Sequence, residues 1–328
     1  MEQKKIQLPK DLQASLTEVK AIIEHQIKVS DPQLQEALIT MAQNGGKFLR
    51  PLLFLIFAQI GQIPRKDQKG INRIAASLEV LHMATLIHDD VIDDSPLRRG
   101  ATSVQAKFGK DVAVYAGDLL FTIFFDLTLD EMGDTPYLKV NATALKEILN
   151  GELGQMHARY QVNQPLSTYL NNAAKKTACL FKLACMEGAY FGGASAEEVT
   201  LASQIGENIG LSFQMLDDVL DYTLDNPDAN KPTLEDLATG VYSLPLLLAL
   251  ENDHSDALKN ILAKKDSLSV QDFRQISRLV VQYEGVAKAR ELAKQYSQQA
   301  LDQINQLPNG QAKKRLLQLT KHLLKRTM

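Results

Sequence analysis

The sequence lacks several features that would place the protein outside the ordinary globular class. Its 36 Lys and Arg residues nearly balance its 39 Asp and Glu residues, so the chain lacks the excess of positive charge that is typical of nucleic-acid-binding proteins. No run of about 18 uncharged apolar residues occurs, and the starting segment MEQKKIQLPKDLQ has no apolar stretch typical of a signal peptide. We therefore expect a cytoplasmic protein that binds no nucleic acid and has at most peripheral membrane contact.

Cysteine is scarce as well. Cys179 and Cys185 are the two in the chain, and neither belongs to a CxxC or Cys/His grouping. We interpret them as small buried hydrophobic residues of a reducing compartment.

Extended alternation of β-branched residues is also scarce. Most long segments instead carry apolar residues at positions i, i+3, i+4 and i+7, as do Leu34, Leu38 and Met41, which is the pattern of amphipathic helices. No linker rich in Pro, Gly or Ser and no fixed-period repeat divides the chain. The sequence predicts an all-α protein, a single domain over residues 1–328 with roughly ten or more helices around a central cavity.

Against this background an acidic cluster is conspicuous. The segment LIHDDVIDDSPLRRG at 86–100 crowds four aspartates together, and MLDDVLDY at 215–222 repeats the spacing of three of them. One such cluster could be a solvated helix end, because Ser95-Pro96 marks a turn. Two clusters with the same spacing favour a shared chemical purpose.

Helical geometry suggests that purpose. Residues i and i+4 lie on one face, so Asp89 and Asp93 point the same way with Asp90 beside them, and Asp217, Asp221 and Asp218 repeat this arrangement. Oxygen ligands without His or Cys select Mg²⁺ or Mn²⁺ over zinc, and Mg²⁺ usually completes its shell with water and substrate phosphate. The two acidic helices therefore predict a magnesium-dependent receptor for a diphosphate.

Cationic residues complete such a receptor. Arg98 and Arg99 follow the first acidic segment, where their guanidinium groups could close on phosphate oxygens. In GGKFLRP, residues 45–51, Lys47 and Arg50 stand in the first turn of a predicted helix, a position that favours a bound anion. This segment indicates a second, metal-free anion site.

In order and spacing, these motifs closely resemble those of the trans-isoprenyl diphosphate synthases. The resemblance rests on GGKFLRP, the Glu79-x-x-His82 pair, LIHDDVIDDSPLRRG, GELGQ at 151–155, KKT at 175–177, GLSFQMLDDVLDY at 210–222 and DLATGVYSLPLL at 236–247. It implies a Mg²⁺-dependent prenyltransferase that condenses an allylic prenyl diphosphate with isopentenyl diphosphate. It also implies a homodimer.

The resemblance assigns a role to each matching residue. It implies metal binding by Asp89, Asp93 and Asp217, supported by Asp90, Asp218, Asp221 and Gln155, with about three ions bound. It implies that the allylic diphosphate is held by Arg98, Lys176 and Lys231, and isopentenyl diphosphate by Lys47, Arg50, His82 and Arg99. Thr177 and Gln214 would line the reaction centre, where oxygen atoms can face a carbocation.

Product length is predicted from the helix that precedes Asp89. Each isoprene unit spans about one helical turn, so Thr85, Ala84 and Leu81 form successive floors of the prenyl tunnel. Thr85 and Ala84 are small where short-chain relatives place an aromatic residue, so we expect a product of about C30 to C50, with C20 as the alternative. Phe121, Phe124 and Phe125 are candidates for a deeper floor.

Two positions depart from the family pattern. Val241 stands where many members carry a lysine that contacts the allylic diphosphate, and Asn230 stands where they carry a glycine. We expect weaker binding of short allylic substrates and retained activity, because every aspartate of both motifs is present.

Other interpretations fit less well. A terpene cyclase has a different second metal motif and needs no isopentenyl site, and a non-catalytic regulatory subunit tends to lose one aspartate motif. Glu79-x-x-His82 resembles half of a di-iron site, but the second half is absent from the sequence. The catalytic subunit of a heteromeric synthase, active only with a small second chain, stays open. His88 receives no role.

The segment KKRLLQLTKHLLKRT at 313–327 predicts a basic amphipathic helix. Such a helix either rests on anionic lipid or, more commonly, packs on its own domain.

Overall fold

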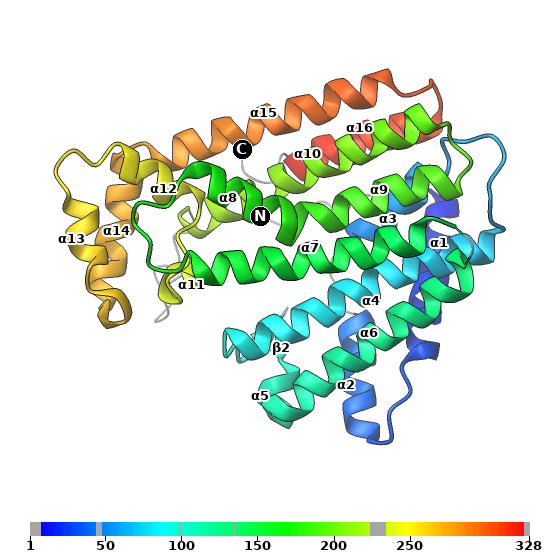
Figure 1. Ribbon diagram of the computed structural model, residues 1–328, viewed down its shortest axis with the longest axis horizontal. Coiled ribbons are helices and arrows are strands. Elements are labelled where there is room, and N and C mark those ends of the chain that lie inside the picture. The colour runs from blue at the N-terminus through cyan, green and yellow to red at the C-terminus, as the bar shows by residue number, and fades with distance from the viewer. Residues whose placement is uncertain (1–7, 44–47, 99, 134, 224–233, 325–328) are drawn as a thin grey trace. The chain divides into compact units, whose positions relative to one another are not determined.

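The computed structural model describes residues 8–43, 48–98, 100–133, 135–223 and 234–324, and within them the regular secondary structure is helical apart from one pair of two-residue strands (Figure 1). This confirms the predicted all-α class with more than ten helices. The elements, in order, are α1 (Lys10–Gln26), α2 (Pro32–Gln43), α3 (Leu49–Phe57), α4 (Gln68–Ile92), β1 (Leu97–Arg98), β2 (Ala101–Thr102), α5 (Val104–Phe108), α6 (Lys110–Met132), α7 (Tyr137–His157), α8 (Leu166–Ala173), the π-helical η1 (Ala174–Ala178), α9 (Cys179–Phe191), α10 (Ala196–Asp221), α11 (Glu235–Ala238), α12 (Leu244–Glu251), α13 (Ala257–Leu262), the 3₁₀ turn η2 (Lys265–Ser267), α14 (Val270–Gln282), α15 (Gly285–Gln306) and α16 (Gln311–Leu324).

The chain divides into two compact units. Unit 1 comprises Met1–Thr143, Leu183–Ser203 and Leu307–Leu316, and unit 2 comprises Ala144–Lys182, Gln204–Gln306 and Leu317–Met328. The first aspartate motif falls in unit 1 and the second in unit 2. A single domain around one cavity stays a prediction.

Unit 1 is built on the long helix α4, which packs along α6 (Figure 1). Asp67 caps α4, its side chain accepting from the Gly70 N–H at 2.8 Å. Arg73 ties the two helices, donating through Nε to Glu131 at 2.7 Å. At Gly117 of α6 an added Cβ would lie 2.4 Å from the His88 ring, so the glycine leaves room for the present position of that ring near the end of α4.

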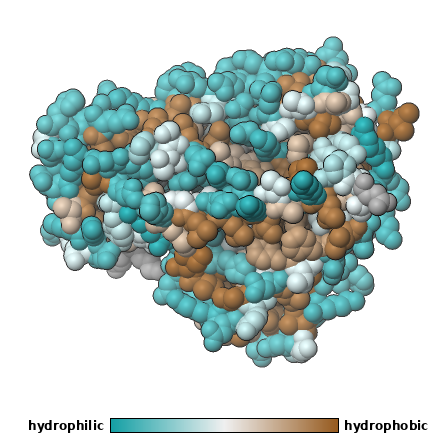
Figure 2. All heavy atoms as spheres, in the orientation of Figure 1, coloured by the Kyte–Doolittle hydropathy of each residue, from teal (hydrophilic) through white to brown (hydrophobic). Residues whose placement is uncertain are grey.

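Helix α6 is unusually apolar. Among the described helices it alone is long and apolar enough to cross a membrane, although 44% of the relevant window is buried inside the protein. A buried core helix passes the same test, and α6 packs its buried face on α4. Its other face exposes Val112, Val114, Tyr115, Phe125 and Leu129. Figure 2 shows hydrophobic side chains gathered where Figure 1 draws α4 and α6.

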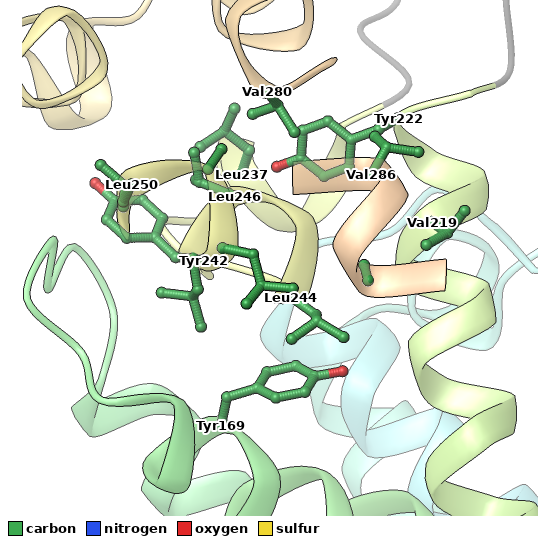
Figure 3. Packing of buried hydrophobic residues seen from close by; sticks show 14 of the residues in the cluster. Tyr169, Val219, Tyr222, Leu237, Tyr242, Leu244, Leu246, Leu250, Val280 and Val286 are labelled. Atoms are coloured by element: carbon green, nitrogen blue, oxygen red, sulfur yellow. The ribbon is translucent and has the colours of Figure 1, made fainter. Parts of the chain in front are cut away.

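Unit 2 has its core around α12, whose residues from Leu244 to Leu250 are all buried. Figure 3 shows Tyr169 of α8 beneath Leu244, with Tyr222 and Val286 on another side of the same cluster. Because fully burying a leucine stabilises a fold by about 1.5–3 kcal/mol, α12 anchors the elements that contact it. The segment just before α12, which includes Val241, is fixed as a result.

The C-terminal helix and the cysteines behave as expected. The apolar side of α16, with Ala312, Leu316, Leu319 and Leu323, is buried, which confirms that this face packs on the protein. Cys185 is fully buried and Cys179 half-buried, and both are free thiols. Burial raises the pKa of Cys179 to about 11, so its thiol stays protonated and unreactive.

Candidate active site

The first aspartate motif lies where α4 ends. Ile92 is the last helical residue, and the N–H of Asp93 still donates to the carbonyl of Asp89 at 2.9 Å. Asp94 then takes a left-handed conformation with φ of 51°, which turns the chain away from the helix axis. Since helical geometry continues to Asp93, the half-buried Asp89 and the exposed Asp93 stand one turn apart on the same side.

Asp90 occupies a different environment. It is 2% exposed, and its Oδ1 accepts from Nε of Arg98 at 2.7 Å and from a second nitrogen of the same guanidinium. Burial raises the pKa of Asp90, and the Arg98 guanidinium opposes that rise. The hairpin of β1 and β2, in which Arg98 pairs with Ala101, brings Arg98 to this place. The buried carboxylate thereby holds Arg98 beside the outer aspartates of the motif.

The second motif repeats this arrangement at the end of α10. Asp217 is exposed and Asp221, the last residue of the helix, is half-buried. Asp218, between them, is 3% exposed. One of its oxygens accepts from Tyr169 Oη at 2.7 Å and from the Leu244 N–H at 3.1 Å, and the other accepts from the amide of Gln214 at 2.8 Å.

A π-helical segment, η1, carries the KKT motif. It interrupts the ordinary helix between α8 and α9, and such bulges are frequent at functional sites. Thr177 Oγ1 donates to Gln214 Oε1 at 2.6 Å, so the two residues predicted at the reaction centre are in direct contact.

The GELGQ motif of α7 lies against this segment. A Cβ at Gly151 would be 2.6 Å from the backbone nitrogen of Lys176, so a glycine is needed for α7 to approach so closely. Lys176 Nζ donates to Gln155 Oε1 at 2.8 Å and pairs with Glu152 at 2.9 Å. The structure thus brings Gln155 into contact with Lys176, whereas the metal-supporting role predicted for Gln155 stays a prediction.

A cavity in unit 2 brings these groups together. It is lined by Gln155, Lys176, Thr177, Gln214 and Asp218, together with Tyr169, Val241 and Tyr242. Val241 is 8% exposed and adds an apolar wall where the family pattern has a lysine.

Of the remaining residues predicted to bind diphosphate, two are described by the structure and three are not. Arg50 and His82 are half-buried in unit 1, on α3 and α4. Lys47, Arg99 and Lys231 lie outside the described residues.

The predicted tunnel residues lie along α4. Leu81 and Ala84 are fully buried, whereas Thr85 is half-buried. The Thr85 hydroxyl donates to the carbonyl of His82 at 2.9 Å, so its polar atom is satisfied within the helix.

The phenylalanines of α6 differ in their surroundings. Phe121 lies against the ring of His88, with centroids 5.3 Å apart, and Phe124 is fully buried. Phe125 is 37% exposed, so it is the weakest candidate for a tunnel floor. His88 Nε2 lies 3.3 Å from Asp118 Oδ1, which places His88 between α4 and α6.

Sequence reasoning missed Tyr169 and the backbone N–H of Leu244. Tyr169 belongs to no motif recognised in the sequence, and a backbone donor has no sequence signature. Both act on Asp218 through a fold that brings α8, α10 and the start of α12 together.

Comparison with known proteins identifies the family. The polyprenyl synthetase family matches residues 31–280. Component 2 of heptaprenyl diphosphate synthase from Geobacillus stearothermophilus is 33% identical over 315 residues, covering 96% of this chain and 97% of the relative. The chain belongs to the polyprenyl synthetase family.

Two solved structures support the same family and show the same fold. A geranylgeranyl pyrophosphate synthase from Lactobacillus brevis superposes with a TM-score of 0.92 at 40% identity, covering 97% of this chain and 98% of that one. A polyprenyl synthase from Caulobacter crescentus, complexed with calcium and isoprenyl diphosphate, gives a TM-score of 0.87 at 29% identity, covering 97% of each chain. As a polyprenyl synthetase, this protein is a prenyltransferase that elongates prenyl chains and has the isoprenoid synthase fold.

The carboxylates of this polyprenyl synthetase fit a divalent cation. Among the described residues, no group of three or more His, Cys, Asp or Glu side chains that could hold a metal ion is present. Each motif instead offers a pair of outer carboxylates, and Mg²⁺ is commonly held by one or two carboxylates plus substrate phosphate. The donor set therefore suits a metal ion that is bound together with a diphosphate.

Proposed function

We propose that this polyprenyl synthetase condenses an allylic prenyl diphosphate with isopentenyl diphosphate and repeats the step to make a long all-trans polyprenyl diphosphate. The observation that carries the proposal is the matched construction of the two aspartate motifs. In each, the outer carboxylates stand one turn apart near the surface, and the middle one is buried and hydrogen-bonded.

The outer carboxylates, Asp89 and Asp93 in one motif and Asp217 and Asp221 in the other, would hold Mg²⁺. When bound, the metal neutralises the leaving diphosphate so that the allylic C–O bond can ionise.

The other side chains bind substrate and protect the cation. Arg98, Lys176 and Lys231 are proposed to contact the oxygens of the allylic diphosphate. Lys47, Arg50, His82 and Arg99 are proposed to hold isopentenyl diphosphate. The oxygen atoms of Thr177 and Gln214 face the allylic cation, which the isopentenyl double bond attacks before a proton leaves to the departed diphosphate.

The proposed product is about C30 to C50, because the side chains of Ala84 and Thr85 are small at the positions expected to close the tunnel first, at about one isoprene unit per helical turn. A C20 product is the second candidate, and the 40% identity to a geranylgeranyl pyrophosphate synthase favours it. The heptaprenyl relative at 33% identity favours the longer product.

We propose that two copies of the chain assemble through the exposed apolar residues of α6, which are Val112, Val114, Tyr115, Phe125 and Leu129. Exposed large apolar side chains gathered on one helix are typical of an interface, and on α6 the exposed Asp118 and Asp126 would add polar contacts to it. The alternative is a small second chain, which the name of the Geobacillus relative, a component 2, brings into consideration. The enzyme is proposed to act in the cytoplasm, where cell fractionation would find it.

The test is incubation of the purified single chain with Mg²⁺, labelled isopentenyl diphosphate and farnesyl diphosphate, followed by sizing of the dephosphorylated products. We expect products of C30 or longer. A stop at C20 would support the second candidate. Absence of elongation by the single chain, with activity appearing only on addition of a second polypeptide, would establish a heteromeric enzyme.

A further inference from the structure

Four side chains of unit 2 form one continuous line of hydrogen bonds. The Tyr169 hydroxyl donates to Asp218, whose other oxygen accepts from the Gln214 amide, and Gln214 Oε1 accepts from the Thr177 hydroxyl. The three distances are 2.7, 2.8 and 2.6 Å, all short enough for strong bonds. The line runs from the buried core shown in Figure 3 to the cavity wall.

This line has a defined direction. Burial raises the pKa of the Asp218 carboxyl, and the hydrogen bonds from Gln214, Leu244 and Tyr169 oppose that rise. Each of these three groups donates to Asp218, so Gln214 turns its NH₂ group toward Asp218 and its oxygen toward Thr177. Thr177 then uses its proton on Gln214, and the lone pairs of its oxygen remain for the cavity. Burial and the charge of Asp218 raise the pKa of Tyr169 well above its ordinary value, so its hydroxyl stays a donor.

Direction matters for the chemistry, because oxygen lone pairs stabilise a developing carbocation, whereas N–H groups destabilise it. If the amide of Gln214 turned over, it would present N–H to Thr177 and free the Thr177 proton to face the cavity. We propose that Tyr169 and Asp218 are positioning residues that fix the orientation of Gln214 and Thr177 toward the allylic cation. This inference rests on the proposed function and deepens it.

The same contacts separate Asp218 from the metal ligands. Both of its oxygens are occupied by three donors, and the side chain is 3% exposed. Asp217 and Asp221, on either side, are the members of this motif that reach the surface. The predicted metal role of Asp218 is thereby replaced by a positioning role.

The variant Asp218→Asn tests the direction of the line with almost no change in shape. Tyr169 and Leu244 both donate, so the new amide must turn its oxygen to them and its NH₂ to Gln214, which then has to turn over. We expect kcat to fall roughly 100-fold, the size found when a preorganised electrostatic contact is lost, with KM for farnesyl diphosphate within about two-fold of wild type.

A second substitution should restore activity. In the double variant Asp218→Asn/Gln214→Glu the new carboxylate accepts both from the amide introduced at position 218 and from Thr177, so oxygen again faces Thr177. We expect kcat to recover by at least about ten-fold relative to Asp218→Asn. A purely structural defect at position 218 would not be relieved by placing a second altered residue beside it.

A milder variant covers the case in which Asp218→Asn does not fold. Tyr169→Phe removes one of three donors and should lower kcat roughly ten-fold. The matched control is Tyr283→Phe, which removes another tyrosine hydroxyl packed against the same core cluster, there hydrogen-bonded to Ser255, and should change kcat less than about two-fold.

A count of bound metal ions tests whether Asp218 is a metal ligand or a positioning residue, and it does not depend on turnover. We would count bound Mn²⁺ by electron paramagnetic resonance with inorganic pyrophosphate present, expecting Asp218→Asn to match wild type and Asp217→Asn to lose metal. Equal losses in the two variants would overturn the proposal, as would an unchanged kcat in Asp218→Asn. A wild-type enzyme that makes no prenyl product would refute the proposed function, whereas the Mn²⁺ count would still decide the role of Asp218.

Discussion

One oxygen of the Asp90 carboxylate accepts hydrogen bonds from two nitrogens of the Arg98 guanidinium, while Asp90 is 2% exposed and the Arg98 side chain 32% exposed. Asp218, the equivalent residue of the second motif, is also buried and hydrogen-bonded. The two motifs therefore divide their aspartates alike, since the middle carboxylate organises neighbouring groups and the outer two lie closer to solvent, where a ligand can reach them.

Removing Arg98 should destabilise the fold, because Asp90 would be left as a buried charge without its partner. We expect Arg98→Met to lower the unfolding free energy by roughly 2–4 kcal/mol, somewhat below the loss for a fully buried pair. Lys110→Met is the matched control, since Lys110 pairs with the exposed Asp94 and should cost less than about 1 kcal/mol. Urea denaturation followed by circular dichroism measures both, and equal effects would show that burial of Asp90 does not matter.

The sequence predicted the helical class and the outer aspartates because both depend on local spacing. An amphipathic period of 3.6 residues fixes a helix, and an i, i+4 spacing fixes which carboxylates share its face, as Asp89 and Asp93 do.

The partners of the middle aspartates could not be predicted in this way. Tyr169 is 49 residues from Asp218 in the chain and the Leu244 N–H is 26 residues away, so only tertiary packing brings them together. The π-helical turn at Lys176 and Thr177 likewise has no signal in the segment AKKTA.

Metal binding should depend on Asp93 and not on its neighbour Asp94. Asp93→Asn removes a proposed ligand, so we expect activity to fall by at least about 100-fold and the apparent Mg²⁺ requirement to rise. Asp94→Asn is the control, because Asp94 turns away at a φ of 51°, a conformation asparagine tolerates well. Steady-state rates over a Mg²⁺ titration would show the difference, and similar losses in both variants would contradict the assignment.

Restoring the family lysine should strengthen substrate binding. Val241 lines the same cavity as Lys176, so Val241→Lys would place a second positive charge near the allylic diphosphate. We expect KM for farnesyl diphosphate to fall by roughly three- to ten-fold, in line with an added charge-assisted contact. Val241→Met adds length without charge and should leave KM unchanged or raised. A lower KM in both variants would point to a packing effect.

Buried Glu187 should make stability depend on pH. Its pKa is raised by burial to about 8, and Asn141 donates to Oε1. Between the ordinary value and about 8, the folded chain keeps a proton that the unfolded chain has lost, so the unfolding free energy falls as pH rises, by up to about 1.4 kcal/mol per pH unit.

Glu187→Gln should remove this slope. Among the described residues, Glu187 Oε2 and Asn141 Oδ1 have no hydrogen-bond partner, and a glutamine amide supplies a donor without a charge. Urea unfolding at about pH 5, 6.5 and 8 would measure the effect, with the exposed Glu251→Gln as control. An unchanged slope in Glu187→Gln would assign the pH dependence to other groups.

Product length should respond to the size of the side chain at position 85. Thr85 is half-buried one turn before Asp89, and its hydroxyl is bonded within α4, so a larger side chain at this position would extend into the proposed path of the prenyl chain. Thr85→Phe should stop elongation early, at about C15 to C20, because a ring would occupy the first turn of the tunnel, which is about 5 Å long.

A longer product is expected from a substitution one helical turn further along α4, away from Asp89. Leu81 is fully buried, and Leu81→Ala should lengthen the product by about one isoprene unit at a cost of roughly 2–5 kcal/mol in stability. Thr85→Val is the control, since it keeps the volume and should keep the product. Liquid chromatography with mass spectrometry of the dephosphorylated products measures the product chain length of all three variants. If Thr85→Phe makes the wild-type product at the wild-type rate, the growing chain does not pass Thr85, and the tunnel must follow another face of α4.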